Sequence, residues 1–378
     1  MMLHNPAYNF LGIAVNMAQS LGLHLDQASD LPQEKAEHRK RIWWALYILD
    51  TRLSVELGRP WTINQCQISL PDDGKSYVGK TYNSFEGTSC LAFFRQMSAL
   101  ALAARSAHVI FYEGRPLDYS NAVDLEESAM RLRGCMESMK SWAANVPSGL
   151  KLRRKHSSPL SIEKVNVQPE EGPPWIQLQR VSLELMYHGF CLSFYRQFIY
   201  YTPHSMLTTP LSDGHATTAL NHGIAITSIV HQMLTKYDTI AGWHDAHNLQ
   251  WDAALTVMAF SIANPICPPT ITSRKTIDIA VEALEISGTS NAPAIIKSLQ
   301  SKAKSVMDHF RRVVNVTTRP INWPSNTSPW LTGSDLSVPN AGATSLDQLW
   351  PDVEQEMWVS FLHELDRDTR PGTLEISL

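Results

Sequence analysis

The sequence predicts an all-α protein of roughly nine to ten helices, because three features of the chain agree. Apolar residues recur at steps of three and four through most of the 378 residues, as they do on one face of a helix. Alternating runs with hairpin turn signals are missing, so no sheet is expected. An apolar content of 44% and a charged content of 18% are typical of an ordered globular chain.

Nine segments carry the helical pattern, and glycines and prolines separate several of them. The expected helices span residues 5–23, 34–57, 84–113, 121–144, 175–201, 214–237, 243–263, 273–287 and 293–314. Prolines and glycines gather in residues 58–84 and 147–174, so both are expected to be loops. The second loop would lie at the surface and join two helical halves.

The helix expected at 34–57 is the centre of the prediction. Gly58 and Pro60 end it. Asp50 lies in its apolar middle, where an unpaired charge is costly, and Arg52 and Arg59 are the nearest cations in sequence. Trp43 and Tyr47 lie beside an apolar stripe that we expect to face the core, made of Ile42, Leu46, Leu49 and Leu53.

A longer pattern runs through residues 21–71. Its members are Leu21-Gly22-Leu23-His24, Arg39, Arg41, Trp43-Trp44, Tyr47, Asp50, Ser54, Gly58-Arg59-Pro60, Ile63 and Leu70-Pro71. The pattern resembles the middle homology region of fungal zinc-cluster transcription factors, the fungal-specific transcription factor domain, and directly covers residues 1–73. The resemblance implies that residues 1–315 form an all-helical regulatory domain. In that family further helices precede the first one, so we expect this chain to begin partway through a domain and to expose an apolar patch.

The resemblance also implies a nuclear protein that controls RNA polymerase II genes and binds DNA through a binuclear zinc module held by six cysteines. This sequence has five cysteines, at 66, 90, 135, 191 and 267, and no CxxC pair. No zinc or other cofactor is therefore expected in this chain, and DNA binding would belong to a missing module. A net charge of −4 and a pI near 6.4 agree that the chain as a whole is not a basic nucleic-acid binder.

The end of the chain differs in composition from the helical body. Residues 316–345 are rich in Pro, Ser, Thr, Asn and Gly, which is typical of a flexible linker. Residues 346–378 alternate acidic with bulky apolar residues, as amphipathic activation segments do. The alternative is a short terminal helix docked on the body. The residues that would enter a coactivator groove are Trp350, Met357, Trp358, Phe361 and Leu362.

Residues 74–81, Gly-Lys-Ser-Tyr-Val-Gly-Lys-Thr, match the phosphate-binding P-loop pattern literally. A P-loop needs a buried strand before it and a helix at its Lys-Thr end. Neither is expected here, so a surface loop is the favoured interpretation. A P-loop NTPase remains an alternative, and it predicts ATP binding that is lost in Lys80→Ala.

No catalytic or metal constellation is predicted. His244 and His247 share a helix face, but they lack a third ligand in a metal-binding spacing, and a helix start with exposed histidines is favoured. No G-x-S-x-G elbow is present. The short basic runs 39–41 and 151–155 are expected to be solvated faces. No apolar run is long enough to span a bilayer, and no membrane partner is expected.

The sequence therefore predicts the regulatory domain of a fungal zinc-cluster transcription factor, not an enzyme. Its expected partners are DNA through the missing module, a small-molecule effector of apolar or mixed polarity, a coactivator at the tail and a second copy of the chain. A further alternative is that the chain is a dimerisation partner of related factors and never contacts DNA. We expect Asp50 to pair with Arg59 or Arg52 and so to fix the Gly58-Arg59-Pro60 turn against the helix.

Overall fold

The computed structural model describes residues 4–305, with gaps at 26–30, 65–67, 74–83, 113–120, 164, 169–171, 200–208, 238–239, 241, 265–266, 268, 288–292, 299 and 302–303. Within these residues the all-α prediction is confirmed. The α-helices are α1 (His4–Ser20), α2 (Gln33–Leu57), α3 (Cys90–Tyr112), α4 (Ala122–Cys135), α5 (Glu137–Asn145), α6 (Pro174–Tyr195), α7 (Pro210–Gln232), α8 (His244–Ala263) and α9 (Pro269–Ile286). Residues 293–298, 300–301 and 304–305 are helical too.

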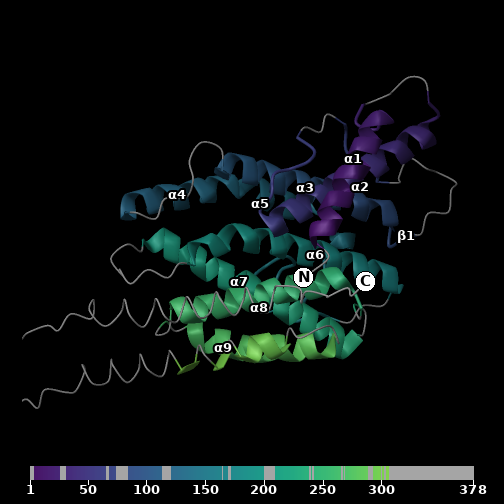
Figure 1. Cartoon of the computed structure of the whole chain (residues 1–378). Coiled ribbons are helices and arrows are strands. Elements are labelled where there is room, and N and C mark those ends of the chain that lie inside the picture. The colour runs from purple at the N-terminus through teal and green to yellow at the C-terminus, as the bar shows by residue number, and fades with distance from the viewer. Residues whose placement is uncertain are drawn as a thin grey trace, which may run out of the picture.

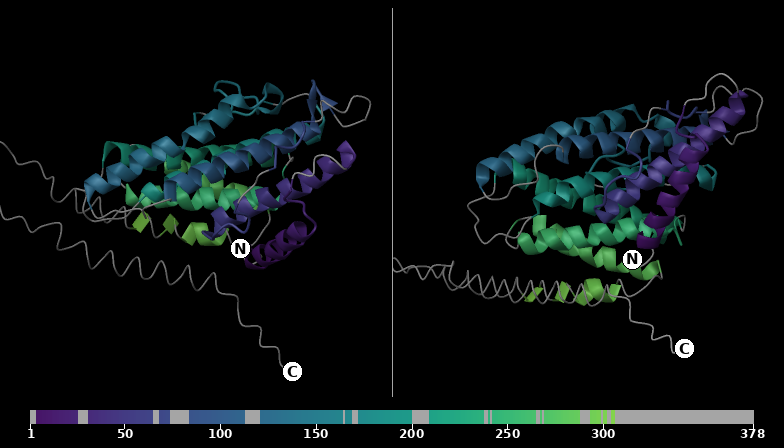
Figure 2. Two further views of the ribbon diagram at one scale, coloured as in Figure 1. Left: turned by 90° about the horizontal axis from the view of Figure 1, so that it is seen from above. Right: turned by 45° about the horizontal axis from the view of Figure 1, so that its top comes forward.

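The helices stack in layers. Helices α3, α4 and α5 lie over α6 and α7, and α8 and α9 follow on the opposite side (Figure 1). The pair α1 and α2, drawn in purple, lies at one end of these layers and reaches the body through α3 (Figure 2). Helix α6 is the centre of the main core, because almost all of its side chains from Val181 to Leu192 are buried. A helix that is buried around its whole circumference belongs in the middle of a stack.

Several element ends follow the expected local chemistry. Gly58 ends α2 in the left-handed conformation, with φ 62°, and its N–H donates to the carbonyl of Ser54. Asn121 caps α4 by accepting hydrogen bonds from the backbone N–H groups of Val123 and Asp124. Thr209 and Ser212 form a capping box at the start of α7.

The buried face of α2 was predicted only in part: Leu46 and Leu53 of the expected stripe are half-buried against the core, but the other two members are not. Ile42 and Leu49, from the expected core stripe, are 40% and 44% exposed. The side chains that face the core are Glu37, Trp43, Trp44, Tyr47, Ile48, Asp50, Thr51 and Ser54. This face carries the larger aromatic surface, and most of its polar groups find hydrogen-bond partners, namely those of Glu37, Trp44, Asp50, Thr51 and Ser54. Burying it is therefore favoured over burying the aliphatic stripe.

Three other local predictions are corrected. A short hairpin, β1 (Ser84–Phe85) and β2 (Thr88–Ser89), precedes α3 where helix was expected, and Glu86 and Gly87 turn it with positive φ. The helix expected at 121–144 is divided at Met136 into α4 and α5. The segment 147–174 is not only a surface loop, since Leu150, Leu152 and Val167 are buried in the main core.

In the part of the chain that the structure describes, no helix combines the length and the hydropathy that crossing a bilayer demands. The predicted linker 316–345 and tail 346–378 lie outside the described residues.

Candidate functional site

The predicted motif residues lie together on α2 and the loop that follows it, and Asp50 is their centre. Its carboxylate is completely buried and accepts hydrogen bonds from the backbone N–H groups of Thr62, at 3.0 Å, and Ile63, at 2.9 Å. These bonds fasten the loop to α2 shortly after the Gly58-Arg59-Pro60 turn. The turn itself is held by Ser54, whose hydroxyl donates to the carbonyl of Pro60.

The cation beside Asp50 is Arg105 of α3, not Arg52 or Arg59. Its Nη2 lies 2.5 Å from Asp50 Oδ2, and the residue is only 5% exposed. Its Nε donates to the Thr51 hydroxyl and its Nη1 to the carbonyl of Ile63. The guanidinium carbon also lies 4.0 Å from the ring centroid of Tyr47 and 4.6 Å from that of Trp61. We call the group Asp50, Thr51, Thr62, Ile63 and Arg105 the Asp50 node.

Arg52 and Arg59 have other roles. Arg52 forms a two-pronged ion pair with Asp245, at 2.7 and 3.0 Å, which joins α2 to the start of α8. Burial opposes ionisation of Asp245, but the Arg52 guanidinium outweighs it and lowers the pKa of that carboxyl. The guanidinium of Arg59 lies over the ring of Tyr8, at 5.0 Å, and so ties the turn to α1.

The remaining motif residues hold the neighbouring segments. Arg39 donates to the carbonyl of Leu21 at the end of α1, and Arg41 donates to the carbonyl of Glu37 one turn earlier on α2. Trp44 donates from its indole N–H to the carbonyl of Ser69, while the Trp43 ring lies near His24. Tyr8 donates to the carbonyl of Pro60. Each contact positions backbone or an aromatic ring, and none of them presents a nucleophile or a metal ligand set.

The same loop forms one wall of a cavity of about 630 Å³. Lys40 and Arg95 hold this wall by donating to Ser69 and to the carbonyl of Pro71, respectively. Buried Glu37 accepts the backbone N–H of Asp72. The lining is mixed and contains aliphatic side chains and both signs of charge: Leu23, Leu25, Leu31, Gln33, Ala36, Glu37, Arg39, Lys40, Ile68, Leu70, Asp72, Asp73 and Arg95.

Arg105 was missed in the sequence analysis, because residues 84–113 were predicted only as an apolar helix. Its signal was a lone cation in Ala-Leu-Ala-Ala-Arg-Ser-Ala, since a charge on an apolar helix face needs a buried partner. Arg105 also acts on its neighbour one turn later. Burial, aided by the Arg105 charge, lowers the pKa of His108 to about 4, so this imidazole is neutral beside Trp61.

A second buried polar group was also missed. Arg154 pairs with Glu184, whose Oε1 lies 3.8 Å from His188 Nε2, and His188 Nδ1 lies 2.8 Å from His222 Nδ1. We call these four residues the His188 chain. Arg154 was predicted to be solvated with the rest of the basic run 151–155, but it is buried. Burial lowers the pKa values of His188 and His222, so both rings are neutral and share one hydrogen bond.

The described cysteines and histidines give little support for a catalytic site. Burial raises the pKa of the Cys191 thiol to about 12 and also raises that of Cys135, so neither is a thiolate near neutral pH. Among the described residues no cluster of three or more His, Cys, Asp or Glu is arranged to hold a metal ion. His247 is half-buried with its Nδ1 3.1 Å from the Ser287 hydroxyl, and the pKa of its imidazole is lowered by burial.

The P-loop match at 74–81 lies outside the described residues, but its flanks are described. Residues 68–73 before it contain no strand, and the hairpin Ser84–Ser89 follows it. A P-loop leads directly into a helix whose N-terminus faces the phosphates. The described flanks therefore do not have the architecture that this motif needs.

Comparison with known proteins identifies the domain that contains the Asp50 node and the cavity. Residues 4–145 match the family model described as fungal specific transcription factor domain. The chain carries a fungal specific transcription factor domain. This domain spans α1 to α5 and therefore includes every residue of the predicted motif.

Two curated relatives are 30% identical to the chain. The terreic acid cluster-specific transcription factor atF of Aspergillus terreus matches over 326 residues, 78% of this chain and 49% of its own length. The transcription factor asqA of Emericella nidulans matches over 331 residues, 80% of this chain and 58% of its own length. The alignments therefore extend well beyond the domain into the later helices.

A third relative is more distant. The oosporein cluster regulator OpS3 of Beauveria bassiana is 21% identical over 285 residues, 67% of this chain and 38% of its own length. The chain thus spans about half the length of the first two relatives and less of the third. No solved structure matches the chain.

Proposed function

We propose that this chain is the regulatory part of a transcription factor that acts in the nucleus on RNA polymerase II genes. The observation that carries the proposal is the match over residues 4–145 together with relatives named as transcription factors over most of the chain. Two relatives bear names that tie them to a terreic acid cluster and an oosporein cluster, which suggests that this chain also controls a biosynthetic gene cluster.

DNA binding, in this proposal, comes from a zinc module and not from the helical body. The residues of this chain do not fit that module, because its five cysteines include no CxxC pair. Of the described cysteines, Cys135 and Cys191 are buried, Cys90 is half-buried and Cys267 is exposed, and the described residues hold no group of three or more His, Cys, Asp or Glu arranged for a metal ion. The body supplies regulation, and residues 346–378 supply contact with a coactivator through the apolar side chains named above.

A reporter assay tests this proposal. The full chain is joined to an unrelated DNA-binding module upstream of an RNA polymerase II reporter. We expect the fusion to change reporter output, and we expect Trp358→Ala with Phe361→Ala to reduce that change. In a gel shift the chain without the module should leave DNA free. A fusion with no effect on the reporter in any growth condition contradicts the proposal.

The cavity beside α2 is the proposed effector site. It is large enough for a small molecule, and its wall is the loop that the Asp50 node and Trp44 hold in place. A ligand there would contact aliphatic side chains as well as the polar groups of Arg39, Lys40 and Glu37. A molecule of mixed polarity, with an apolar body and hydrogen-bonding groups at one edge, fits that lining.

A cavity-filling substitution tests the effector site without knowledge of the ligand. Ala36 lines the cavity, and the neighbouring Lys35 is exposed outside it. We expect Ala36→Trp to hold reporter output at one level across growth conditions that change wild-type output. Lys35→Trp is the matched control and should respond as the wild type does. Equal responses from both variants would place the effector elsewhere.

A further inference from the structure

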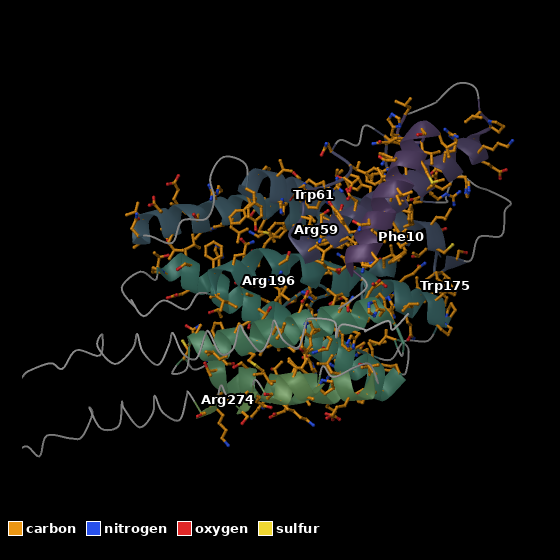
Figure 3. All side chains as sticks on the ribbon, in the orientation of Figure 1. Phe10, Arg59, Trp61, Trp175, Arg196 and Arg274 are labelled. Atoms are coloured by element: carbon orange, nitrogen blue, oxygen red, sulfur yellow. The ribbon has the colours of Figure 1, made fainter. Side chains whose placement is uncertain are left out.

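The cavity beside α2 is lined by two arginines that come from different helices, Arg39 of α2 and Arg95 of α3. Both residues are half-buried. The cavity lies at the start of α2, whereas Arg59 and Trp61, which are labelled in Figure 3, follow the end of the same helix. At about 1.5 Å per residue, about 30 Å along α2 separate Arg59 from Arg39. The charge at the cavity therefore comes from its own lining and not from the turn after α2.

Each of the two lining arginines is bonded to a neutral oxygen. Arg39 Nη2 donates to the carbonyl of Leu21 and Arg95 Nη1 donates to that of Pro71, both at 2.7 Å. Within the described ranges of the chain, neither guanidinium forms an ion pair with a carboxylate. A guanidinium carries five N–H donors in a planar fork, so one carbonyl leaves most of them for a further acceptor. Two half-buried cations without a carboxylate favour an anion beside them.

The other charged side chains of the lining already have partners. Lys40 donates to the Ser69 hydroxyl and lies 3.5 Å from Glu37. The Glu37 carboxylate also accepts the backbone N–H of Asp72. Asp72 and Asp73 line the cavity as well, and both have contacts of their own. These acids repel negative charge, so the lining favours a ligand with one negative charge over a ligand with two.

We propose that the cavity takes a small organic acid with one carboxylate, and that Arg39 and Arg95 select its charge. The two oxygens of a carboxylate match the fork of a guanidinium, and a charge-assisted hydrogen bond is roughly twice as strong as a neutral one. The apolar body of the acid lies against the aliphatic side chains of the same lining. That this acid is the effector rests on the proposed function, whereas its binding in the cavity does not.

Calorimetric titration of the full chain tests this charge preference without knowledge of the natural ligand. The probes are hexanoate, hexanamide and hexylammonium, which share an apolar chain of similar length and differ in charge. We expect hexanoate to bind at least about fivefold more tightly than hexanamide, because the amide cannot form charge-assisted bonds with both partners ionised. Hexylammonium should bind more weakly than either, because it would meet the two arginines.

Substitutions in the lining assign the preference to named side chains. Arg39→Met and Arg95→Met should each lower the affinity for hexanoate towards that for hexanamide, and should leave hexanamide binding unchanged. Lys35→Met is the matched control, because Lys35 is an exposed cation on the same helix outside the cavity, and it should bind hexanoate as the wild type does. Ala36→Trp, which fills the cavity, should abolish the binding of both probes. If an arginine variant does not fold, the wild-type preference and Ala36→Trp still decide.

The results that overturn the proposal are distinct. Hexanoate that does not bind, or that binds no more tightly than hexanamide, shows that the cavity does not select a carboxylate. Tighter binding of hexylammonium assigns the selection to the acids of the lining. Hexanoate binding that survives Ala36→Trp lies outside the cavity. The reporter fusion is measured separately, and a chain that binds hexanoate in the cavity but never changes the reporter refutes the proposed function and leaves the charge preference intact.

Discussion

The Asp50 node and the His188 chain are both buried polar groups, but they differ in what they hold. The node bonds mainly to the backbone of one loop, through the N–H groups of Thr62 and Ile63 and the carbonyl of Ile63. The His188 chain joins side chains of the segment around Arg154, α6 and α7. A buried charge that is bonded to backbone fixes a local conformation, whereas a chain of side chains ties separate helices together.

The two groups also differ in how they depend on protonation. The node contains no histidine, and Arg105 uses Nε, Nη1 and Nη2 within it. The His188 chain needs one ring to donate and the other to accept at Nδ1, so protonation of the accepting ring breaks this bond. The node is therefore sensitive to the loss of one partner, whereas the His188 chain is sensitive to acid.

The largest effect is expected from Asp50→Ala. The substitution leaves Arg105 buried without its carboxylate and removes the acceptor of two backbone N–H groups. We expect the free energy of unfolding to fall by about 3–5 kcal/mol, measured by urea denaturation. Asp50→Ala with Arg105→Met is the control and should recover part of that loss, because no charge is then left unpaired. A wild-type midpoint in Asp50→Ala would show that the node holds nothing.

The second effect is a loss of stability in acid. The pKa values of His188 and His222 are lowered in the folded chain, so the unfolded chain, with pKa values near 6.5, takes up protons first as the pH falls. Stability is fully present above about pH 6.5 and decreases below it by about 1.4 kcal/mol per pH unit for each histidine.

The pH profile of a variant assigns that loss to the His188 chain. His188→Asn with His222→Asn should show a shallower fall of the thermal midpoint between pH 6.5 and 5. The lowered pKa values of His108, His215 and His247 leave a residual slope in both proteins. If the double variant falls as steeply as the wild type, the two rings do not carry the acid sensitivity.

A smaller effect is expected at the Gly58-Arg59-Pro60 turn that follows α2. Gly58 has φ 62°, and a Cβ there meets nothing within 4 Å, so Gly58→Ala costs only the left-handed backbone strain. We expect a loss of about 1–2 kcal/mol in urea denaturation. Gly134→Ala is the control, because Gly134 lies within α4 and a Cβ there also meets nothing; it should stabilise the chain by about 0.5–1 kcal/mol. Equal effects of both variants would mean that the turn conformation is not required.

The smallest effect is expected at the ion pair that joins α2 to the start of α8. Arg52→Ala breaks the ion pair with Asp245. The side chain of Arg52 is 17% exposed and that of Asp245 is 33% exposed. Solvent screening limits the loss to about 1 kcal/mol or less, and added salt should reduce it further. Lys140→Ala, which removes a fully surface pair with Glu137, should change the midpoint less still. A loss comparable to that of Asp50→Ala would make this link part of the core.

The sequence could predict what depends on near neighbours. The extent of α2, its end at Gly58 and the burial of Trp43 and Tyr47 followed from patterns within a few residues of one another. The side of α2 that faces the core did not, because its aliphatic and aromatic stripes compete and the outcome depends on what α1 and α3 offer them. The hairpin at 84–89 was missed because two-residue strands are too short for an alternating pattern.

By itself, the sequence determined that this protein is helical, that it carries a fungal specific transcription factor domain, and that its tail has an acidic amphipathic pattern. Only the tertiary structure decided that Asp50 pairs with Arg105, 55 residues away, and that His188 meets His222. Several cations could have neutralised Asp50, and local spacing ranks the nearest one first. Packing ranks them by position instead, because only the cation that α3 places against α2 can be buried with every nitrogen bonded.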